Sequence, residues 1–329
     1  MVNKFEKTKV FPIIFVLLSL SLIIGTSVVE AVDYPTRPIT LIIQFVAGTS
    51  TDVIARRLSD RVSKDLGQPI IPINKPGGGG TIGVAELVRS KPDGYTISCI
   101  NMPALSIIPH MQTLPYDPLK DIAHICVISP YEYGLYVRGD APWKSLEEFI
   151  DYVRKNLGKV TYGSVGPGTT NHLIMVIIGK EHNLDWKHVP YKGDGELIPA
   201  ILGGHVDAGV GSPPALMPQI KGGKLKLLVV TSKDRWSYLP EVPTLHDKGY
   251  KFYQASYLSL GLPAGTPEPI RQKLEEAFKK ALQDRNLNKE FEEKYYAKLA
   301  YISGAEYKKF ISEQFLFYKD FLKTIGLTK

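Results

Sequence analysis

The sequence predicts an α/β protein built from two domains, and three observations support this expectation. The chain has 329 residues, and domains commonly hold about 100 to 200 residues. Short runs of β-forming residues alternate with segments of helical periodicity, which is typical of α/β units. A strand, a loop and a helix near the start of the chain recur in the same order in its middle. The content of 44% hydrophobic and 22% charged residues excludes a disordered chain.

Residues 1–31 differ in kind from the rest of the chain. Three lysines precede an apolar run over residues 10–24, and Val29 and Ala31 place small residues at the positions that a signal peptidase reads. The alternative is a membrane anchor, but the run of 15 residues contains Pro12 and is shorter than the roughly 20 residues of a spanning helix. We therefore expect a secretory signal that is removed after Ala31, and an exported protein.

The first α/β unit begins soon after this signal. Residues 39–45 predict a strand, and the small residues 47–51 end it. Apolar residues then recur at helical spacing from Ile54 to Leu66, and Gly67 ends the helix. The same reasoning predicts a strand over 70–74, a loop over 76–80, a helix over 81–89 and a strand over 95–100.

The middle of the chain repeats this order after a break. Residues 122–137 contain two apolar runs separated by Ser129 and Pro130, and we expect them to cross between domains. Ser145 and Glu148 form a capping box that opens the next helix. Strands are then expected over 160–164, 188–191, 206–210 and 225–231, a loop over 166–170 before a helix, a second crossing over 252–262, and helices over 267–282, 286–295 and 305–325. The two crossings predict one lobe from residues 34–135 and 256–329, and a second from residues 136–255.

Two strand-to-helix loops, residues 48–52 and 164–170, share a design that suits an anionic ligand. Their small residues let a ligand approach the backbone, and the free N–H groups and the helix dipole favour negative charge. Helix capping by Ser and Thr explains either loop alone. The presence of two such loops favours a carboxylate site. Asp52 is explained equally well by the helix dipole or by a direct or water-mediated ligand contact.

A glycine-rich segment also requires interpretation. Gly78, Gly80 and Gly83 match the pattern G-x-G-x-x-G between a strand and a helix. The following strand ends at Asn101 and lacks the acidic residue that binds a ribose in dinucleotide-binding folds. We therefore favour a tight turn that lines a cleft, and we expect no cofactor.

Nucleophilic catalysis is the main alternative to binding. Ser164 lies in a strand-to-helix turn with His172 nearby, so an exported hydrolase that uses these two residues must be considered. The turn lacks the first glycine of the G-x-S-x-G pattern, and no third catalytic partner is evident. We favour a binding protein without enzymatic activity.

Charge and cysteine content exclude further classes. The chain carries 40 basic and 33 acidic residues, but the basic residues lie on polar helix faces without interleaved aromatics, which indicates solvated surface and no nucleic-acid partner. Cys99 and Cys126 lie in apolar stretches and are expected to be buried free thiols. No Cys or His pair has the spacing of zinc ligands, and we expect no metal.

Ten short motifs follow one another along the mature chain. They are YPTRPI (34–39), FVAGTSTD (45–52), NKPG (74–77), KPDGYT (91–96), LPYDP (114–118), YGS (162–164), HVPYKG (188–193), GGHVD (203–207), PEVPT (240–244) and PAGTP (263–267). In these motifs the chain resembles the Bug family, the periplasmic solute receptors of tripartite tricarboxylate transporters.

The resemblance implies a two-lobed type II periplasmic binding protein that closes on a small carboxylate between its lobes. It also implies a periplasmic monomer that works with the membrane subunits of a transporter; an orphan receptor that presents its ligand to a membrane sensor is the other possibility. Together with the two loops, it places the following residues at the ligand: Gly48, Thr49, Ser50, Thr51, Asp52, Met102, Ser164, Val165, Gly166, Thr169, Thr170, His172, Ser212 and Tyr257.

The chain departs from the family pattern at several of these positions. Thr49 and Ser50 replace the usual glycines of the first loop, and Tyr257 stands where a Trp is common. Gly211 stands where an acidic residue is often found. Because a buried ammonium needs a paired charge, this loss predicts a ligand without an amino group.

Overall fold

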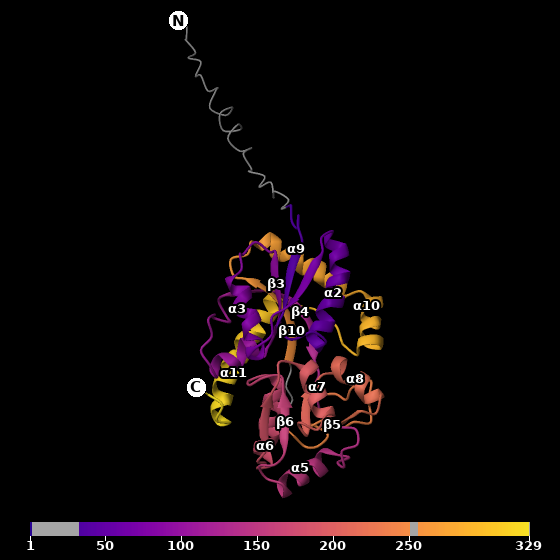
Figure 1. Cartoon of the computed structure of the whole chain (residues 1–329). Coiled ribbons are helices and arrows are strands. Elements are labelled where there is room, and N and C mark those ends of the chain that lie inside the picture. The colour runs from indigo at the N-terminus through magenta and orange to yellow at the C-terminus, as the bar shows by residue number, and fades with distance from the viewer. Residues whose placement is uncertain (2–32, 251–255, 329) are drawn as a thin grey trace. The chain divides into compact units, whose positions relative to one another are not determined.

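The computed structural model describes Met1, residues 33–250 and residues 256–328 (Figure 1). The expected secretory signal lies outside the described residues, as do residues 252–255 of the expected second crossing. In the part of the chain that is described, no helix has both the length and the hydrophobicity needed to cross a membrane. From residue 34 onward, strands and helices alternate along the described chain. The strands form two sheets.

The first sheet has six strands drawn from both ends of this unit. They are β1 (Ile39–Ile43), β2 (Ile70–Asn74), β3 (Thr96–Asn101), β4 (Ile122–Tyr131), β10 (Ser256–Pro263) and β11 (Ile302–Ser303). Their order in space is β11, β4, β10, β3, β1, β2. β1 is parallel to β2 and β3, whereas β10 is antiparallel to β3 and β4. A strand from late in the chain therefore completes the sheet that the early strands begin.

The second sheet has five strands, all from the middle of the chain. They are β5 (Gly134–Arg138), β6 (Thr161–Ser164), β7 (Lys187–Pro190), β8 (Ala208–Gly211) and β9 (Leu225–Val230), in the spatial order β7, β6, β8, β5, β9. β6 is parallel to β7 and β8, and β5 is antiparallel to β8 and β9. Since β4 ends at Tyr131 in one sheet and β5 starts at Gly134 in the other, the chain passes between sheets within the expected crossing segment.

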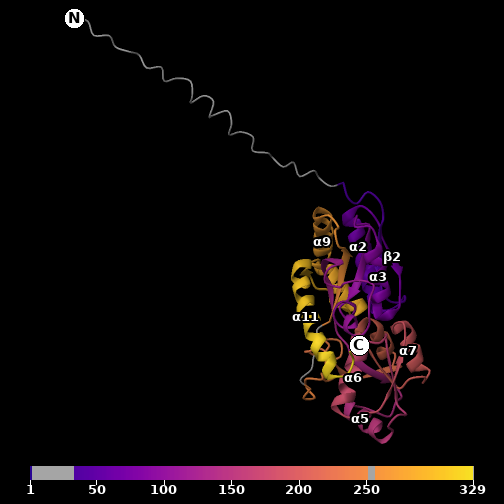
Figure 2. The ribbon, with the colours of Figure 1, turned by 90° about the vertical axis from the view of Figure 1, so that its left-hand side faces the viewer.

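Helices flank both sheets. Figure 2 shows α2 (Ser50–Leu66), α3 (Thr81–Arg89), α9 (Glu268–Leu282) and α11 (Gly304–Thr324) around the first sheet. The second sheet carries α5 (Leu146–Lys155), α6 (Thr170–Glu181), α7 (Asp194–Leu202) and α8 (Pro213–Lys221). The shorter elements are η1 (Gly78–Gly80), α4 (Pro103–Ser106), η2 (Ile108–His110), α10 (Arg285–Glu290) and the π-helical turn η3 (Phe291–Tyr295).

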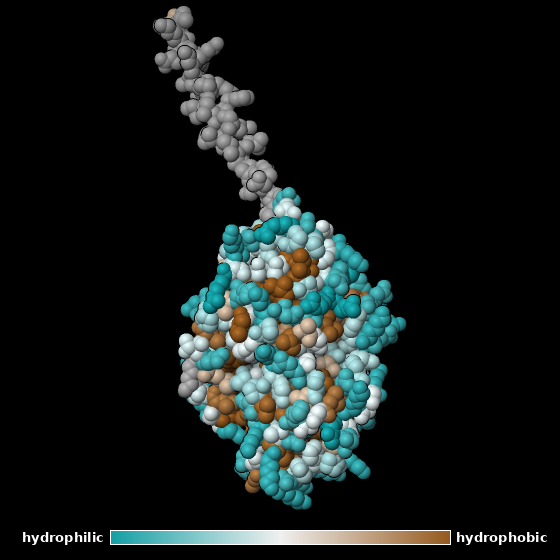
Figure 3. Space-filling view, in the orientation of Figure 1, coloured by the Kyte–Doolittle hydropathy of each residue, from teal (hydrophilic) through white to brown (hydrophobic). Residues whose placement is uncertain are grey.

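Residue alternation along β1 explains why helices cover both faces of the first sheet. Leu41 packs in one core cluster with Leu58 of α2 and Phe278 of α9. Its neighbour Ile42 belongs to a second cluster with Leu87 of α3 and with α11. Successive strand residues point to opposite faces, and burying each such side chain contributes about 1.5–3 kcal/mol. On the face shown in Figure 3, apolar residues lie in small groups between polar ones.

The expected α/β class is confirmed, and most differences are small shifts at element ends. The strand expected over 39–45 ends at Ile43, and the helix expected over 286–295 divides into α10 and η3. The short strand β11 was not expected. Its two residues, Ile302 and Ser303, are too few for a periodic pattern, and they form a strand only because they pair with β4.

The two cysteines are buried and free, as expected. Cys99 of β3 and Cys126 of β4 both pair with Leu260 of β10, from opposite sides. Because β10 lies between them, the two thiols are two strand spacings apart and too distant for a disulfide.

Candidate ligand-binding site

A cavity of about 420 Å³, including the part open to solvent, lies where the strand-to-helix loops of the two sheets meet. From the first sheet and its loops it is lined by Phe45, Thr49, Ser50, Thr51, Gly79, Asn101, Pro103 and Tyr131. Tyr133, Val165, Thr169, Thr170, Asn171, Gly193, Asp194 and Ser212 complete the wall.

The two loops singled out in the sequence start α2 and α6 in the same way. The N-cap residues Thr49 and Thr169 have φ, ψ angles of −74°, 162° and −72°, 161°. Each threonine hydroxyl accepts from the N–H three residues on, at 3.3 Å for Asp52 and 3.5 Å for His172. The first N–H groups of each helix have no intrahelical acceptor, so both helices present donors and the positive end of a dipole at the cavity.

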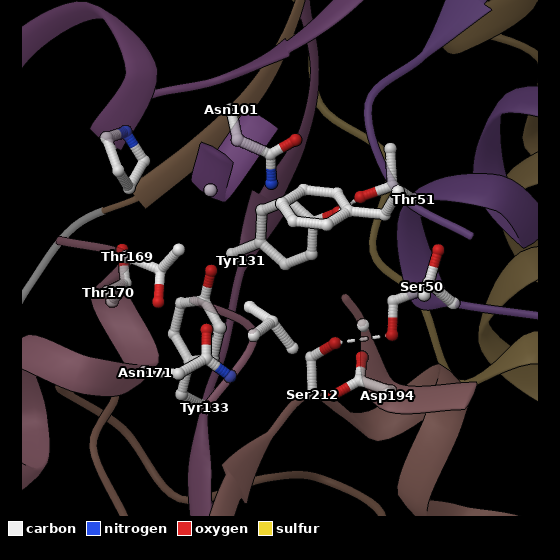
Figure 4. A pocket seen from close by; sticks show the side chains of 16 residues that line it. Ser50, Thr51, Asn101, Tyr131, Tyr133, Thr169, Thr170, Asn171, Asp194 and Ser212 are labelled. Carbon is white, nitrogen blue, oxygen red and sulfur yellow. Dashed lines mark hydrogen bonds between the residues drawn. The ribbon is translucent and has the colours of Figure 1, made fainter. Parts of the chain in front are cut away.

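Hydroxyl groups join the two sides of the cavity. The Ser212 hydroxyl at the start of α8 donates to the Ser50 hydroxyl at 2.5 Å (Figure 4). The Thr170 hydroxyl of α6 donates to Ser256 of β10 at 3.4 Å. Within the first-sheet side, Thr51 and Tyr131 share a hydrogen bond of 2.5 Å between their oxygens. These three contacts join residues that are 162, 86 and 80 positions apart in sequence.

Asp52 is buried but does not line the cavity. Its carboxylate accepts from the backbone N–H of Gly48 at 3.1 Å, from Arg56 Nε at 2.9 Å and from Asn74 Nδ2 at 2.8 Å. All three donors belong to the first-sheet side. Of the two sequence-based interpretations, the structure favours a structural role at the start of α2.

Ser164 and His172 are not paired with each other. The Ser164 hydroxyl is fully buried and hydrogen-bonds to His188 Nε2 at 2.7 Å. His172 Nδ1 accepts from the Gly168 N–H at 3.2 Å, and its ring stacks on His188 with centroids 4.2 Å apart. Burial lowers the pKa of each histidine to about 4, and the neighbouring His188 makes a smaller contribution to the lowered pKa of His172. The pair expected for the hydrolase alternative is therefore wrong, and neither residue lines the cavity.

Four other expected residues also lie outside the cavity wall. Met102 is fully buried in the core beside α4. Tyr257 of β10 packs its ring against Phe310 of α11, with centroids 5.2 Å apart. Gly48 adopts a positive φ of 82° that turns the chain into α2. Gly166 lies close to the glycine-rich turn η1, since a Cβ atom there would lie 3.3 Å from the Cα atom of Gly79.

Seven expected residues do line the cavity: Thr49, Ser50, Thr51, Val165, Thr169, Thr170 and Ser212. Sequence reasoning missed Tyr131 and Tyr133, which lie in the crossing between β4 and β5, where only apolar content was considered. It also missed Asn101 at the end of β3 and Asp194 after β7. Both follow the carboxyl ends of strands, which is a signal that could have identified them.

Asp194 is the one charged residue in the described wall of the cavity. Its side chain is 7% exposed, and its Oδ1 atom has no hydrogen-bond partner among the described residues. Burial raises the pKa of this carboxyl to about 7. The premise that the site lacks an acidic group, based on Gly211, is therefore wrong, because Asp194 supplies a carboxylate from another loop.

The described residues that line the cavity include no Lys, Arg or His. No group of three His, Cys, Asp or Glu side chains in the described chain could hold a metal ion. The wall therefore offers hydroxyls, amides, helix N-termini and one carboxylate.

Comparison with known proteins agrees with this geometry. The model of a family described as the tripartite tricarboxylate transporter family receptor matches residues 54–327. The chain belongs to this family. It is 39% identical over 300 residues to the UPF0065 protein in the gbd 5' region of Cupriavidus necator, and the match covers 91% of each chain. The Bug resemblance drawn from the ten motifs is thereby confirmed.

Solved structures of periplasmic binding proteins extend the match to three dimensions. BugD superposes with a TM-score of 0.86 at 29% identity, covering 90% of this chain and 100% of BugD. R. palustris Rpa4515 with adipate gives 0.86 at 27% identity, over 90% and 99% of the two chains. MatC (Rpa3494) from Rhodopseudomonas palustris with bound malate gives 0.82 at 26% identity, over 87% and 99%. This family receptor therefore has the two-lobed periplasmic binding protein fold.

Proposed function

We propose that this family receptor captures a small carboxylate in the cavity and delivers it to the membrane subunits of a tripartite tricarboxylate transporter. In this proposal residues 34–135 and 256–329 form one lobe and residues 136–255 the other. The protein reaches the periplasm through a signal that is removed after Ala31, and it acts as a monomer without enzymatic activity. Ser50, Thr51, Thr169, Thr170 and Ser212 contact the ligand.

The observation that carries the proposal is the paired arrangement of α2 and α6 at one cavity. Each helix begins with a threonine cap in nearly the same conformation, and each leaves backbone N–H groups at the cavity wall. Two helix N-termini attract an anion without any cationic side chain. The relatives with adipate and malate support a carboxylate as that anion.

The same geometry argues against turnover in the cavity. The one candidate nucleophile, Ser164, is fully buried and hydrogen-bonded to His188. A general base must reach the proton that it abstracts in a substrate pose, and neither residue borders the cavity.

Mass spectrometry of the compound released from protein purified without refolding tests the proposal. We expect a small molecule with at least one carboxylate, and calorimetry should then show it to bind purified, emptied protein. Ser50→Ala should weaken binding by about 2-fold to 12-fold, the equivalent of one neutral hydrogen bond. Ser312→Ala, on the exposed side of α11, is the matched control and should bind as the unmodified protein does. A released compound without a carboxylate contradicts the proposal.

A growth or uptake assay tests the delivery step. A strain that lacks the gene should fail to import the released compound, and reintroducing the gene should restore import. Normal import in the deletion strain, together with a lost regulatory response to the compound, would instead support a receptor that presents its ligand to a sensor.

A further inference from the structure

Asp194 occupies an unusual position in the cavity wall. It is the first residue of α7, its side chain is 7% exposed, and it borders the cavity together with Gly193 and Ser212. Figure 4 shows its carboxylate beside Ser212 and Ser50, with Thr169 and Thr170 on the opposite side of the view. Among the described residues, Oδ1 has no hydrogen-bond partner.

Helix capping does not explain this carboxylate. Glu196, on the same first turn of α7, is exposed and accepts a hydrogen bond from the Lys192 N–H at 3.1 Å. Asp52, in the first turn of α2, accepts from three donors. Both of these acids accept hydrogen bonds from nearby residues, whereas Asp194 lines the cavity and its Oδ1 atom has no partner among the described residues. A buried carboxylate without partners is costly, so its retention points to a partner that arrives with the ligand.

No positively charged partner of Asp194 is found among the described residues of the cavity wall. The negative charge of Asp194 acts on the phenols of Tyr133 and Tyr136, and burial raises the pKa of both, so they are neutral. Ser50 and Ser212 are hydrogen-bonded to each other. No Lys, Arg or His is among the described residues of the cavity wall.

We propose that the ligand is a small zwitterion, whose ammonium group pairs with Asp194 and whose carboxylate lies at the N-termini of α2 and α6. This inference rests on the proposed function, because it assumes that the cavity holds a carboxylate. It adds a second charge to the ligand and assigns Asp194 as the residue that selects it. The ammonium group of such a molecule is complementary to the Asp194 carboxylate, and its carboxylate is complementary to the N–H donors at the starts of α2 and α6.

One other use of Asp194 predicts the opposite pH dependence. A protonated Asp194 could donate to a second carboxylate of a ligand without nitrogen, because burial raises its pKa to about 7. Binding of that ligand would weaken as the pH rises through 7. Binding of a zwitterion needs the ionised carboxylate, so it weakens as the pH falls below 7.

Calorimetry with matched ligands tests the inference. L-Aspartate and L-malate share one carbon skeleton and differ only in an ammonium and a hydroxyl group. The other protein amino acids, succinate and adipate are screened with them by thermal shift, and every compound that shifts the melting temperature is measured by calorimetry at pH 5.5, 7 and 8.5. We expect an amino acid to bind more tightly than any of the nitrogen-free acids, and more tightly at pH 8.5 than at pH 5.5.

Variants of Asp194 identify the residue responsible. Asp194→Asn should weaken amino-acid binding by about 10-fold to 100-fold, as expected for loss of a charge-assisted hydrogen bond, and should remove its pH dependence. Asp194→Ser gives a second, smaller replacement, and circular dichroism reports whether either variant is folded. Glu196→Gln is the matched control, because it removes an exposed acid from the same helix turn, and it should change nothing.

The outcomes separate this inference from the proposed function. Tight binding of malate, succinate or adipate with none of any amino acid overturns the zwitterion and leaves a carboxylate receptor. Binding that strengthens as the pH falls also overturns it, in favour of a protonated Asp194. An amino acid that binds Asp194→Asn as well as the unmodified protein removes the role of Asp194. Binding of no compound that carries a carboxylate contradicts both proposals.

Discussion

Thr49 illustrates how a single residue caps a helix that begins at the site. The resemblance to the Bug family suggested that Thr49 stands in place of a glycine in this loop and that its hydroxyl contacts the ligand. The structure shows that hydroxyl donating to the Val46 carbonyl at 3.0 Å and accepting from the Asp52 N–H at 3.3 Å. Both hydrogen-bonding functions are therefore used within the cap, and the first effect of removing it falls on stability.

We expect Thr49→Ala to lower the free energy of unfolding by about 0.5–2 kcal/mol, because Asp52 N–H loses its capping acceptor. Thr49→Ser keeps the hydroxyl and should retain most of the stability. Denaturant unfolding measures both variants. A large loss of ligand affinity in Thr49→Ala at unchanged stability would show that the hydroxyl acts on the ligand and not on the helix.

Ionisation of Asp194 should lower the free energy of unfolding of the receptor without ligand. Its pKa in the folded protein, about 7, lies above the ordinary value of 3.8 for an aspartic acid. The folded state therefore holds the proton more tightly than the unfolded state, and stability falls as the pH rises from about 4 to 7. Asp194→Asn should increase the free energy of unfolding at pH 8 by an amount on the order of 4 kcal/mol, and this gain should disappear near pH 4. Equal stability of the variant and the unmodified protein at pH 8 would show that the carboxylate has a partner.

At the scale of elements, glycines set how closely the loops of the two sheets approach. A Cβ atom on Gly79 would lie 3.2 Å from Thr169 Cγ2, and one on Gly193 would lie 2.7 Å from Thr49 Cγ2. Gly193 has a φ of 164°, an extended conformation open to any residue. Space, and not backbone strain, requires a glycine there.

Gly193→Ala should therefore leave each α/β unit intact and hinder the approach of the α2 loop to the α7 loop. We expect ligand affinity to fall by about 5-fold to 160-fold, because closure of the cavity is opposed by a steric clash of this kind, typically about 1–3 kcal/mol. Gly222→Ala is the control, since its nearest contact would be an ordinary 3.4 Å to the Pro218 carbonyl. Affinity within 2-fold of the unmodified protein would contradict the role given to this contact.

At the scale of the whole molecule, buried histidines couple stability to pH. Burial lowers the pKa of His124, His172 and His188 to about 4, with smaller effects of Lys308 on His124 and of His188 on His172. Because these folded-state pKa values lie below the ordinary histidine value of 6.5, the stability that they provide is present above pH 6.5 and is lost as the pH falls toward 4. Protonation of Asp194 increases stability as the pH falls over this range, but it is a single group, whereas three histidines decrease stability.

We expect the free energy of unfolding to decrease between pH 6.5 and pH 4.5. His124→Phe should reduce this decrease by an amount on the order of 2 kcal/mol, because a neutral ring keeps the edge contact with Tyr307 and cannot be protonated. His205→Gln changes an exposed residue and serves as the control. An identical pH profile for His124→Phe and the unmodified protein would contradict this account.

Closure of the two lobes is also a property of the whole molecule. We predict that the two lobes close around the ligand, because the groups proposed to bind it come from both sides of the cavity. Small-angle scattering should show a smaller radius of gyration in the presence of the compound identified by mass spectrometry. An unchanged radius at saturation would indicate that the receptor is closed without ligand.

The sequence by itself determined the local order of the fold. Alternating apolar periods located the strands and helices, and the threonine, serine and glycine residues of the two loops identified the starts of α2 and α6. These signals are local, because a helix cap and a strand period involve residues within a few positions of one another. Ten ordered motifs were then sufficient to identify the family.

Tertiary structure decided what those elements do at the site. Only the fold shows that Ser164 bonds to His188 and not to His172, and that Tyr257 faces α11. Only the fold shows that Asp194 is buried in the cavity wall and that its Oδ1 atom has no hydrogen-bond partner in the part of the chain that is described. The placement of β10 between β3 and β4 is also a long-range result. Burial and pairing depend on contacts between residues far apart in the chain. No local sequence pattern depends on those contacts. The position of the Asp194 carboxylate in the cavity wall could therefore be seen only in the tertiary structure.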